Sequence, residues 1–212
     1  MLPVSRAALM VFSLAAINAA PQDGASTGAV AARFDKIYAA PSKLFSAAPN
    51  AFLVRAVRDL KPGQALDVAM GQGRNALFLA KAGWDVTGYD VSETGLAAAR
   101  ASAAKEGLRL NALRSSHQEF DFGRERWDLI VMTYTLADME DAAFLRRVRD
   151  SLRPGGFVVV EQMNAGGTGK GPANALFRSF QDLRVVQYED MVDTAEWGLQ
   201  KMRIGRLVAQ KD

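Results

Sequence analysis

Two acidic residues and a pair of glycines stand at spacings that suit the binding of a small ligand. Gly71 and Gly73, followed by Ala76, fit the pattern G-x-G-x-x-G/A at the turn between an expected strand and an expected helix. Glycines there let the backbone approach a ligand closely, and the helix start offers unpaired N–H donors. Asp90 ends the next expected strand, where a carboxylate can accept hydrogen bonds from both hydroxyls of a ribose. The spacing therefore predicts a ligand that contains adenosine.

Asp67 indicates which adenosine ligand the loop binds. It lies inside an otherwise apolar expected strand, where a carboxylate must be satisfied because its burial is costly. We expect it to accept hydrogen bonds from the glycine-loop amides or from a cationic group of the ligand. A dinucleotide would bring a pyrophosphate, which this carboxylate would repel, whereas S-adenosylmethionine carries an ammonium and a sulfonium and no phosphate. Asp67 therefore favours S-adenosylmethionine, although a buried acid that only braces the loop is compatible with the same ligand.

The composition narrows the remaining classes of function. The chain has 212 residues, 49% hydrophobic and 23% charged, as expected for one folded domain. It has no cysteine, which excludes disulfides, thiolate zinc sites and cysteine nucleophiles, and its one histidine, His117, excludes a histidine-rich metal site. The net charge of +3 is spread along the chain, so no nucleic-acid partner is expected.

The elements that must position the loop alternate between strand and helix. Apolar segments predict seven strands, at 65–70, 84–89, 108–113, 127–133, 157–161, 184–188 and 202–209. Helical patterns lie at 34–60, in two pieces, and at 73–82, 93–106, 141–152 and 173–183. This alternation predicts an α/β fold: a Rossmann-like, doubly wound, mostly parallel seven-stranded sheet with helices on both faces. No long helix separates the last two strands, so the terminal strand should be antiparallel.

The first residues resemble a targeting segment rather than a part of the fold. One positive charge in 1–6 precedes an apolar run over 7–16, and small residues follow, as in a secretory signal peptide. The run is shorter than the roughly 20 residues of a membrane span. We expect 1–20 to direct export to the periplasm or to tether the chain to a membrane. A wrongly chosen start codon or a simple leader helix remains the alternative, with a cytoplasmic protein as its consequence.

Residues 21–33 are rich in Gly, Ala and Ser and predict a linker, so the folded domain is expected over 34–212, with 34–60 as an N-terminal helical cap. The sequence predicts no particular oligomeric state.

The strand-and-loop segment 67–73 resembles motif I of the class I S-adenosylmethionine-dependent methyltransferases, whose pattern is acid-x-Gly-x-Gly-x-Gly. Ala69 stands at the first glycine of that pattern. Asp90 matches the ribose-binding acid of the family, while 127–131 resembles its fourth strand and 152–156 the turn before its fifth. The similarity runs from about Phe34 to the C-terminus.

A finer resemblance concerns the helix after the loop. Arg74, Asn75 and the residues up to Ala80 are close to the corresponding run in small tellurite-resistance-type and thiopurine-like methyltransferases. Ser116 takes the position of the family's adenine-binding acid, with Gln118 or Glu119 as substitutes. The resemblance implies S-adenosylmethionine as cofactor, no metal, and a cofactor site made of Asp67, Ala69, Gly71, Gly73, Arg74, Asn75, Asp90, Val91, Ser116, His117 and Gln118.

Methyl transfer from a sulfonium needs chiefly alignment and exclusion of water. Soft nucleophiles need no strong base, whereas an alcohol, phenol or ammonium must lose a proton. Tyr134 and Asp138 follow the fourth strand and are the catalytic candidates, with side-chain packing and helix capping as their structural alternatives. Glu161 and His117 also fall near strand ends, but we expect His117 to be a solvent-exposed loop residue.

Two aromatic residues near the expected start of the domain, Phe34 and Tyr38, are expected to cover the cofactor as a lid or to dock an apolar helix face. The glycine-rich run 166–171 fails the phosphate-loop pattern and is interpreted as a loop beside the site. The sequence therefore predicts a methyltransferase for a small-molecule acceptor. The alternatives are a non-catalytic module that binds S-adenosylmethionine and, less favoured, a nicotinamide-dependent oxidoreductase.

Overall fold

The structure is a computed structural model that describes residues 26–40, 46–135, 137–163 and 172–212. The expected leader 1–20 and the loop 166–171 lie outside the described residues. In chain order the elements are α2 (Thr27–Ala39), α3 (Ala51–Ala56), β1 (Gln64–Val68), α4 (Arg74–Lys81), β2 (Asp85–Asp90), α5 (Glu93–Lys105), β3 (Asn111–Arg114), β4 (Trp127–Thr133), α6 (Ala142–Ser151), β5 (Leu152–Met163), α7 (Ala175–Ser179), β6 (Arg184–Thr194) and β7 (Lys201–Gln210).

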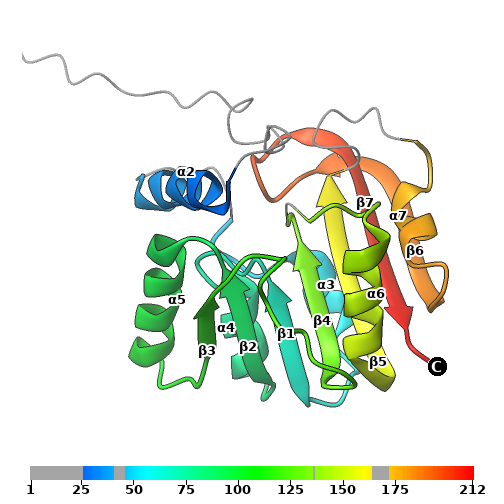
Figure 1. Cartoon of the computed structure of the whole chain (residues 1–212), viewed down its shortest axis with the longest axis horizontal. Helices are drawn as coiled ribbons and strands as arrows, with labels where there is room; N and C mark the ends of the chain where they lie inside the picture. Colours follow the sequence, from blue (N-terminus) through cyan, green and yellow to red (C-terminus); the bar gives the residue numbers. More distant parts are fainter. Residues whose placement is uncertain (1–25, 41–45, 136, 164–171) are drawn as a thin grey trace, which may run out of the picture.

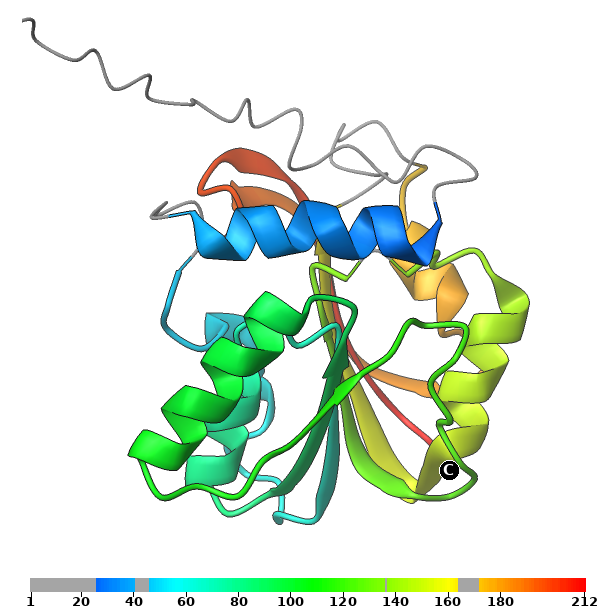
Figure 2. The same ribbon diagram turned by 60° about the vertical axis from the view of Figure 1, so that its left-hand side comes forward.

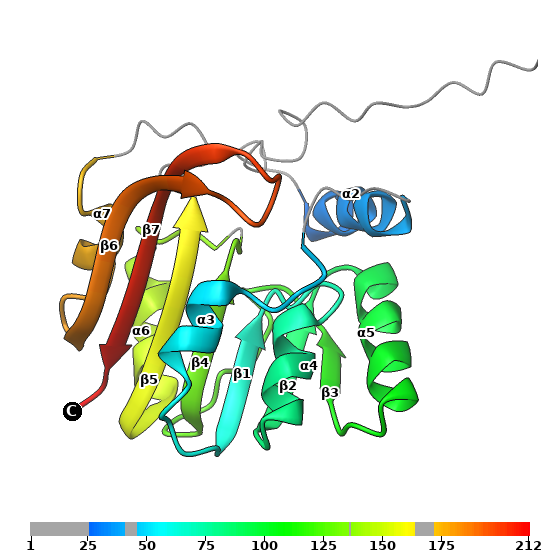
Figure 3. The ribbon, with the colours of Figure 1, turned by 180° about the vertical axis from the view of Figure 1, so that it is seen from behind.

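The seven strands form one sheet in the order β3-β2-β1-β4-β5-β7-β6 (Figure 1). The strands from β3 to β5 pair in parallel, and β7 pairs antiparallel with both β5 and β6. Helices α6 and α7 cover one face, and α3, α4 and α5 lie on the other (Figures 1 and 3). The doubly wound α/β fold with an antiparallel strand near its end is confirmed.

Apolar side chains on both faces of the central strands explain this layering. Every residue of β4 from Leu129 to Met132 is buried, and alternate side chains enter opposite cores. Ile130 and Met132 face the aromatic core under α6 and α7, while Leu129 and Val131 face the core under α3 and α4. A strand that is apolar on both faces is stable only between two helix layers, so the sequence pattern and the architecture agree.

The parallel register brings four strand ends to one edge of the sheet. Val68 of β1 pairs with Tyr89 of β2 and with Met132 of β4, and Met132 pairs with Val160 of β5. The residues that follow these positions therefore meet at the carboxyl edge, where open α/β sheets bind their ligands. Helix α2 lies across this edge, above α5 (Figure 2).

Several expected boundaries were wrong. Helix α2 begins at Thr27, inside the segment expected to be a linker, because Ser26 caps it by accepting a hydrogen bond from the Ala29 amide. Strand β5 begins at Leu152, before the expected turn 153–156, and its pairing with β4 is irregular at that point. Helix α7 has five residues rather than the eleven expected over 173–183, because the chain turns at Phe180 and Leu183, which are both buried.

Candidate functional site

The loop between β1 and α4 alternates left-handed residues. Ala69, Gly71 and Gly73 have φ angles of 55°, 54° and 80°. Only glycine adopts this region without strain, and a residue with a Cβ atom pays roughly 1–2 kcal/mol. The glycines are therefore required by the backbone itself, and Ala69 holds a strained conformation at the position where the family pattern has glycine. Strain of this kind concentrates at functional sites.

Asp67, the acid of β1, is buried directly beneath the loop. Its side-chain oxygen Oδ2 has no hydrogen-bond partner within the part of the chain that the structure describes. Burial raises the pKa of Asp67 to about 7, although the Arg74 charge and a hydrogen bond from the Ala76 amide act in the opposite direction. An unsatisfied buried carboxylate is costly in a protein with nothing bound, and a cationic ligand would satisfy it. The site therefore fits a positively charged ligand group.

Asp90, the acid at the end of β2, holds the loop in place. Its Oδ2 accepts a hydrogen bond of 2.9 Å from the Gly71 amide, and its Oδ1 accepts one of 2.8 Å from the Ser92 amide. Burial is the main cause that raises its pKa. Each carboxylate oxygen has two lone pairs, so each retains one acceptor position for a ribose hydroxyl.

Helix α2 closes over the loop. Tyr38 lies so near that a Cβ atom placed on Gly71 would collide with its hydroxyl oxygen. Burial and the nearby carboxylates of Asp90 and Asp67 raise the pKa of Tyr38 well above its ordinary value. The ring of Trp197, in the β6–β7 connection, lies 6.4 Å from the rings of both Phe34 and Tyr38, measured between ring centroids. Three aromatic side chains therefore lie together over the predicted cofactor site.

Asp35 fastens the same helix to the end of β2. Its Oδ1 accepts a hydrogen bond of 2.6 Å from the Ser92 hydroxyl and one of 3.0 Å from the Thr94 amide. These bonds, the Ser92 bond foremost, lower the pKa of Asp35. Because the Ser92 amide also donates to Asp90, the lid helix α2 is anchored two residues from the carboxylate expected to hold the ribose.

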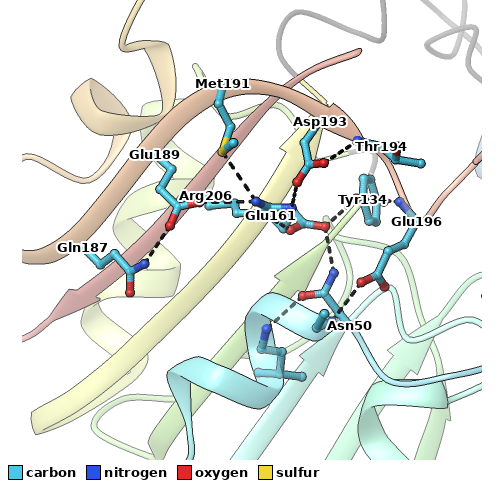
Figure 4. A network of polar contacts seen from close by, with 12 residues as sticks. Asn50, Tyr134, Glu161, Gln187, Glu189, Met191, Asp193, Thr194, Glu196 and Arg206 are labelled. Carbon is cyan, nitrogen blue, oxygen red and sulfur yellow. Dashed lines mark hydrogen bonds and ion pairs between the residues drawn. The ribbon is translucent and has the colours of Figure 1, made fainter. Parts of the chain in front are cut away.

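Tyr134 and Glu161 lie together at the tips of β4 and β5 (Figure 4). The Tyr134 hydroxyl donates a short hydrogen bond to Oε1 of Glu161 and accepts one of 3.0 Å from the Glu196 amide. Asn50 donates a bond of 2.7 Å to the same Glu161 oxygen. Tyr134 has φ 53°, a strained value for a residue with a side chain, so the surrounding contacts hold it in place.

Arg206 of β7 completes this polar network. Its guanidinium pairs with Glu161 at 2.5 Å, with Asp193 at 2.8 Å and with Glu189 at 3.3 Å. Glu161 is therefore an ion-paired carboxylate with both oxygens engaged, and the Tyr134 hydroxyl has its donor and an acceptor position occupied. Neither group stands ready as a general base. The sequence did not indicate Asn50 or Arg206, because they lie 111 and 45 positions from Glu161 in the chain.

Glu196 joins the β6–β7 connection to the first turn of α4. Its carboxylate pairs with Arg74 at 2.6 Å and accepts a bond of 2.8 Å from the Ala51 amide. Asn75 accepts a bond from the Asn50 amide and donates one to Thr133, each of 2.8 Å. The side chains of Arg74 and Asn75, predicted to bind cofactor, thus bind other segments of the chain, while their backbone lies at the start of α4.

The segment after β3 differs from expectation at His117. Its Nδ1 lies 3.0 Å from the Tyr89 hydroxyl, its Nε2 lies 3.2 Å from the Thr135 hydroxyl, and its ring packs edge-on against Phe144. Burial lowers the pKa of His117 to about 4. The expectation of a solvent-exposed histidine was wrong, because the aromatic core under α6 extends to this loop.

The remaining predicted residues lie around this edge. Ser116 is buried and exchanges hydrogen bonds with Glu119 in a local capping arrangement, whereas Gln118 is exposed. Val91 follows Asp90 directly and is half-buried. Asp138 is exposed and its carboxylate accepts a bond from the Glu140 amide, outside the Tyr134 network. It does not cap α6, whose N-cap is Asp141.

The described residues contain neither a candidate metal cluster nor a candidate membrane span. No group of three histidine, cysteine or acidic side chains there could hold a metal ion. Among the same residues, no helix combines the length and the apolar character that crossing a bilayer requires.

Comparison with known proteins finds similarity to methyltransferases over part of the chain. A family model described as a methyltransferase domain matches residues 65–156. A ubiquinone biosynthesis O-methyltransferase of Bradyrhizobium diazoefficiens is 31% identical over 112 residues, which are 52% of this chain and 44% of that protein. The probable S-adenosyl-L-methionine-dependent methyltransferase TehB of Haemophilus influenzae is 33% identical over 81 residues, 38% of this chain and 28% of that protein. The matched region thus spans less than half the length of these curated relatives.

Solved structures agree on the fold. TehB from Haemophilus influenzae superposes with a TM-score of 0.68 at 21% identity, covering 86% of this chain and 67% of that one. A 1,6-didemethyltoxoflavin-N1-methyltransferase from Burkholderia thailandensis gives a TM-score of 0.58 at 20% identity, covering 76% and 78% of the two chains. At these identities the likeness concerns the architecture.

Proposed function

We propose that the chain is a class I S-adenosylmethionine-dependent methyltransferase, which transfers a methyl group from this cofactor to a small-molecule acceptor. The observation that carries the proposal is the buried carboxylate of Asp67, whose Oδ2 has no partner within the described residues and lies beneath the glycine loop. The ammonium and sulfonium of the cofactor would supply positive charge to pair with the negative charge of this carboxylate. The pyrophosphate of a dinucleotide would add negative charge beside it.

Bound S-adenosylmethionine supplies an electrophilic methyl group on a sulfonium. Asp90 would hold the ribose hydroxyls, and the loop amides would lie along the rest of the cofactor. Phe34, Tyr38 and Trp197 exclude water from above. Tyr134, at the tip of β4, would line the acceptor side of the site.

The hydrogen bonds and the ion pair that Tyr134 and Glu161 already form limit the kinds of acceptor that the site can use. With neither group free to take a proton, the favoured acceptors are those that reach the site with a nucleophilic lone pair already available. One similar protein is named an O-methyltransferase of ubiquinone biosynthesis and another an N1-methyltransferase of 1,6-didemethyltoxoflavin, so both oxygen and nitrogen acceptors belong in a test.

Calorimetric titration with S-adenosylhomocysteine and with NAD tests the cofactor. We expect binding of the first alone, and binding of NAD alone would indicate an oxidoreductase. Asp90→Ala should weaken the binding of S-adenosylhomocysteine by about 1.5–3 kcal/mol, as for hydrogen bonds to a charged group. Unchanged affinity would contradict the role given to Asp90.

Transfer of tritiated methyl groups to thiols, oxyanions, phenols and amines tests the reaction. A tritiated product formed with one of these four classes identifies the type of acceptor. Binding of S-adenosylhomocysteine without transfer to any class would instead indicate a non-catalytic module.

We also propose, from the apolar run over 7–16 alone, that residues 1–20 export the chain or tether it to a membrane. Fractionation of the native cell, with the mass of the mature N-terminus, tests this. Recovery of the whole chain in the cytosol would contradict it.

A further inference from the structure

A cavity lies away from the cofactor loop, between α6 and the chain that forms and follows α7. It measures about 450 Å³, which is within the range of small-molecule sites in proteins. Its lining shares no residue with the glycine loop, the lid or the Tyr134 network. Helix α7 ends after five residues, and Phe180 and Leu183, which follow it, contribute to the lining of the cavity.

Three arginines line this cavity, and they differ in whether an acidic side chain already pairs with their positive charge. Arg149 forms an ion pair with Asp182, which also lines the cavity. Arg178 donates to the carbonyl of Ala173, which leaves its positive charge without an acidic partner. Arg146 has no hydrogen-bond or ion-pair partner among the described residues. Glu140 on the rim is the only other acidic side chain in the lining, so the cavity keeps a net charge of +1.

The cavity also has an apolar floor, by which we mean three of its lining residues. Phe180 and Leu183 are buried, and Leu145 of α6 is half-buried. A wholly polar ion would gain nothing from this floor, and a wholly apolar molecule would leave the guanidinium groups without a partner. The two parts together suit a molecule with an anionic group at one end and an apolar body at the other.

We propose that the α6–α7 cavity binds an amphipathic anion, with a carboxylate, phosphate or sulfonate between Arg146 and Arg178 and an apolar body against Phe180 and Leu183. Planar guanidinium groups bind such oxyanions with paired hydrogen bonds, which are stronger than bonds between neutral groups. Burial of the apolar body against Phe180 and Leu183 adds a favourable hydrophobic contribution. The anion comes from a free metabolite or from a lipid headgroup, and both share this chemistry.

Fluorescence titration of the full chain with 8-anilinonaphthalene-1-sulfonate tests the proposal, because this probe joins a sulfonate to an aromatic body. The titration is run with S-adenosylhomocysteine present, which would keep the probe from the cofactor loop. We expect saturable binding that weakens at least tenfold in the double variant Arg146→Gln/Arg178→Gln. The matched control Arg109→Gln/Arg124→Gln removes two exposed arginines elsewhere and should bind like the natural chain.

Equal affinity in both double variants, or no saturable binding to the natural chain, would overturn the proposal. Thermal melts of the two variants show whether a loss of binding reflects a loss of folding, and a single variant Arg146→Gln provides a milder change. Displacement of the probe by phenyl phosphate supports a soluble ligand, whereas displacement only by phosphatidylglycerol vesicles supports a lipid headgroup. The proposal does not depend on the proposed methyl transfer, since the double variant should bind S-adenosylhomocysteine normally.

Discussion

At the scale of single residues, the buried Asp67 and the half-buried His117 are ionisable groups whose pKa values move in opposite directions. Burial raises the pKa of the Asp67 carboxyl to about 7 and lowers that of the His117 imidazole to about 4. In both cases the uncharged form is the one that the folded protein favours. Each therefore lowers stability over a pH range in which the group is charged in the unfolded chain.

Asp67→Asn is expected to stabilise the protein without ligand at pH 8 by about 2–4 kcal/mol. In the natural chain the folded state keeps the proton up to pH 7 and the unfolded state only to about pH 4, so stability falls as the pH rises through that window. The difference from the variant should vanish near pH 4. Thermal melts at pH 4, 6 and 8 measure it.

The same substitution should weaken the binding of S-adenosylhomocysteine by tenfold or more, because a charged acceptor becomes neutral. Asp59→Asn, at an exposed position, serves as the control in both measurements. A variant that is less stable than the natural chain at pH 8 would show that the Asp67 charge is satisfied within the protein.

His117→Gln should remove a loss of stability that the natural chain suffers in acid. Between about pH 6.5 and pH 4 the unfolded chain binds a proton at this site and the folded chain does not, so stability falls as the pH decreases. The effect reaches about 3 kcal/mol at pH 4. Denaturant titrations of the natural chain and the variant at pH 4.5 and 7.5 measure this effect. If the free energy of unfolding changes equally with pH in both chains, the lowered pKa of His117 is disproved.

At the scale of elements, the lid α2 depends on two separate attachments. Asp35 binds the start of α5, and Phe34 and Tyr38 pack on Trp197 of the β6–β7 connection. The hairpin of β6 and β7 therefore supports a helix that lies more than 150 residues earlier in the chain.

Trp197→Ala should loosen α2 while leaving the sheet intact. Without the indole ring the lid retains only the Asp35 attachment of the two described above, so its amides should exchange hydrogen faster and the KM for the cofactor should rise. Hydrogen exchange read by mass spectrometry measures the first effect. Leu199→Ala, in the same connection and half-exposed, is the matched control. Unchanged exchange in α2 would place the support of the lid elsewhere.

At the scale of the whole molecule, the fold was predictable because it follows from repeated patterns. Apolar strands such as 127–133, with helices between them, define a sheet buried on both faces, and the glycine loop lies where that architecture binds ligands. The network around Glu161 was not predictable, because Asn50 and Arg206 reach it from distant parts of the chain. The burial of His117 was missed for the same reason, since Tyr89 and Phe144 enclose it through tertiary packing.

Ligand binding should stabilise the molecule as a unit. At a concentration one hundred times its Kd, S-adenosylhomocysteine should raise the free energy of unfolding by about 2.7 kcal/mol. The strongest added protection from hydrogen exchange should appear in α2, which covers the loop (Figure 2). Differential scanning calorimetry with and without ligand measures the first effect. Stabilisation without added protection of α2 would mean that the ligand binds outside the covered loop.

The hairpin β6–β7 has an evolutionary consequence. Glu196, Trp197 and Arg206 lie on one uninterrupted piece of chain, and they contact the start of α4, the lid and the tip of β5. Exchange of the gene segment for this hairpin would change these three sets of contacts at the candidate site, while β1 and β2 would stay as they are. Under the proposed function, acceptor preference would then diverge through this hairpin, without renewed selection for binding of the methyl donor.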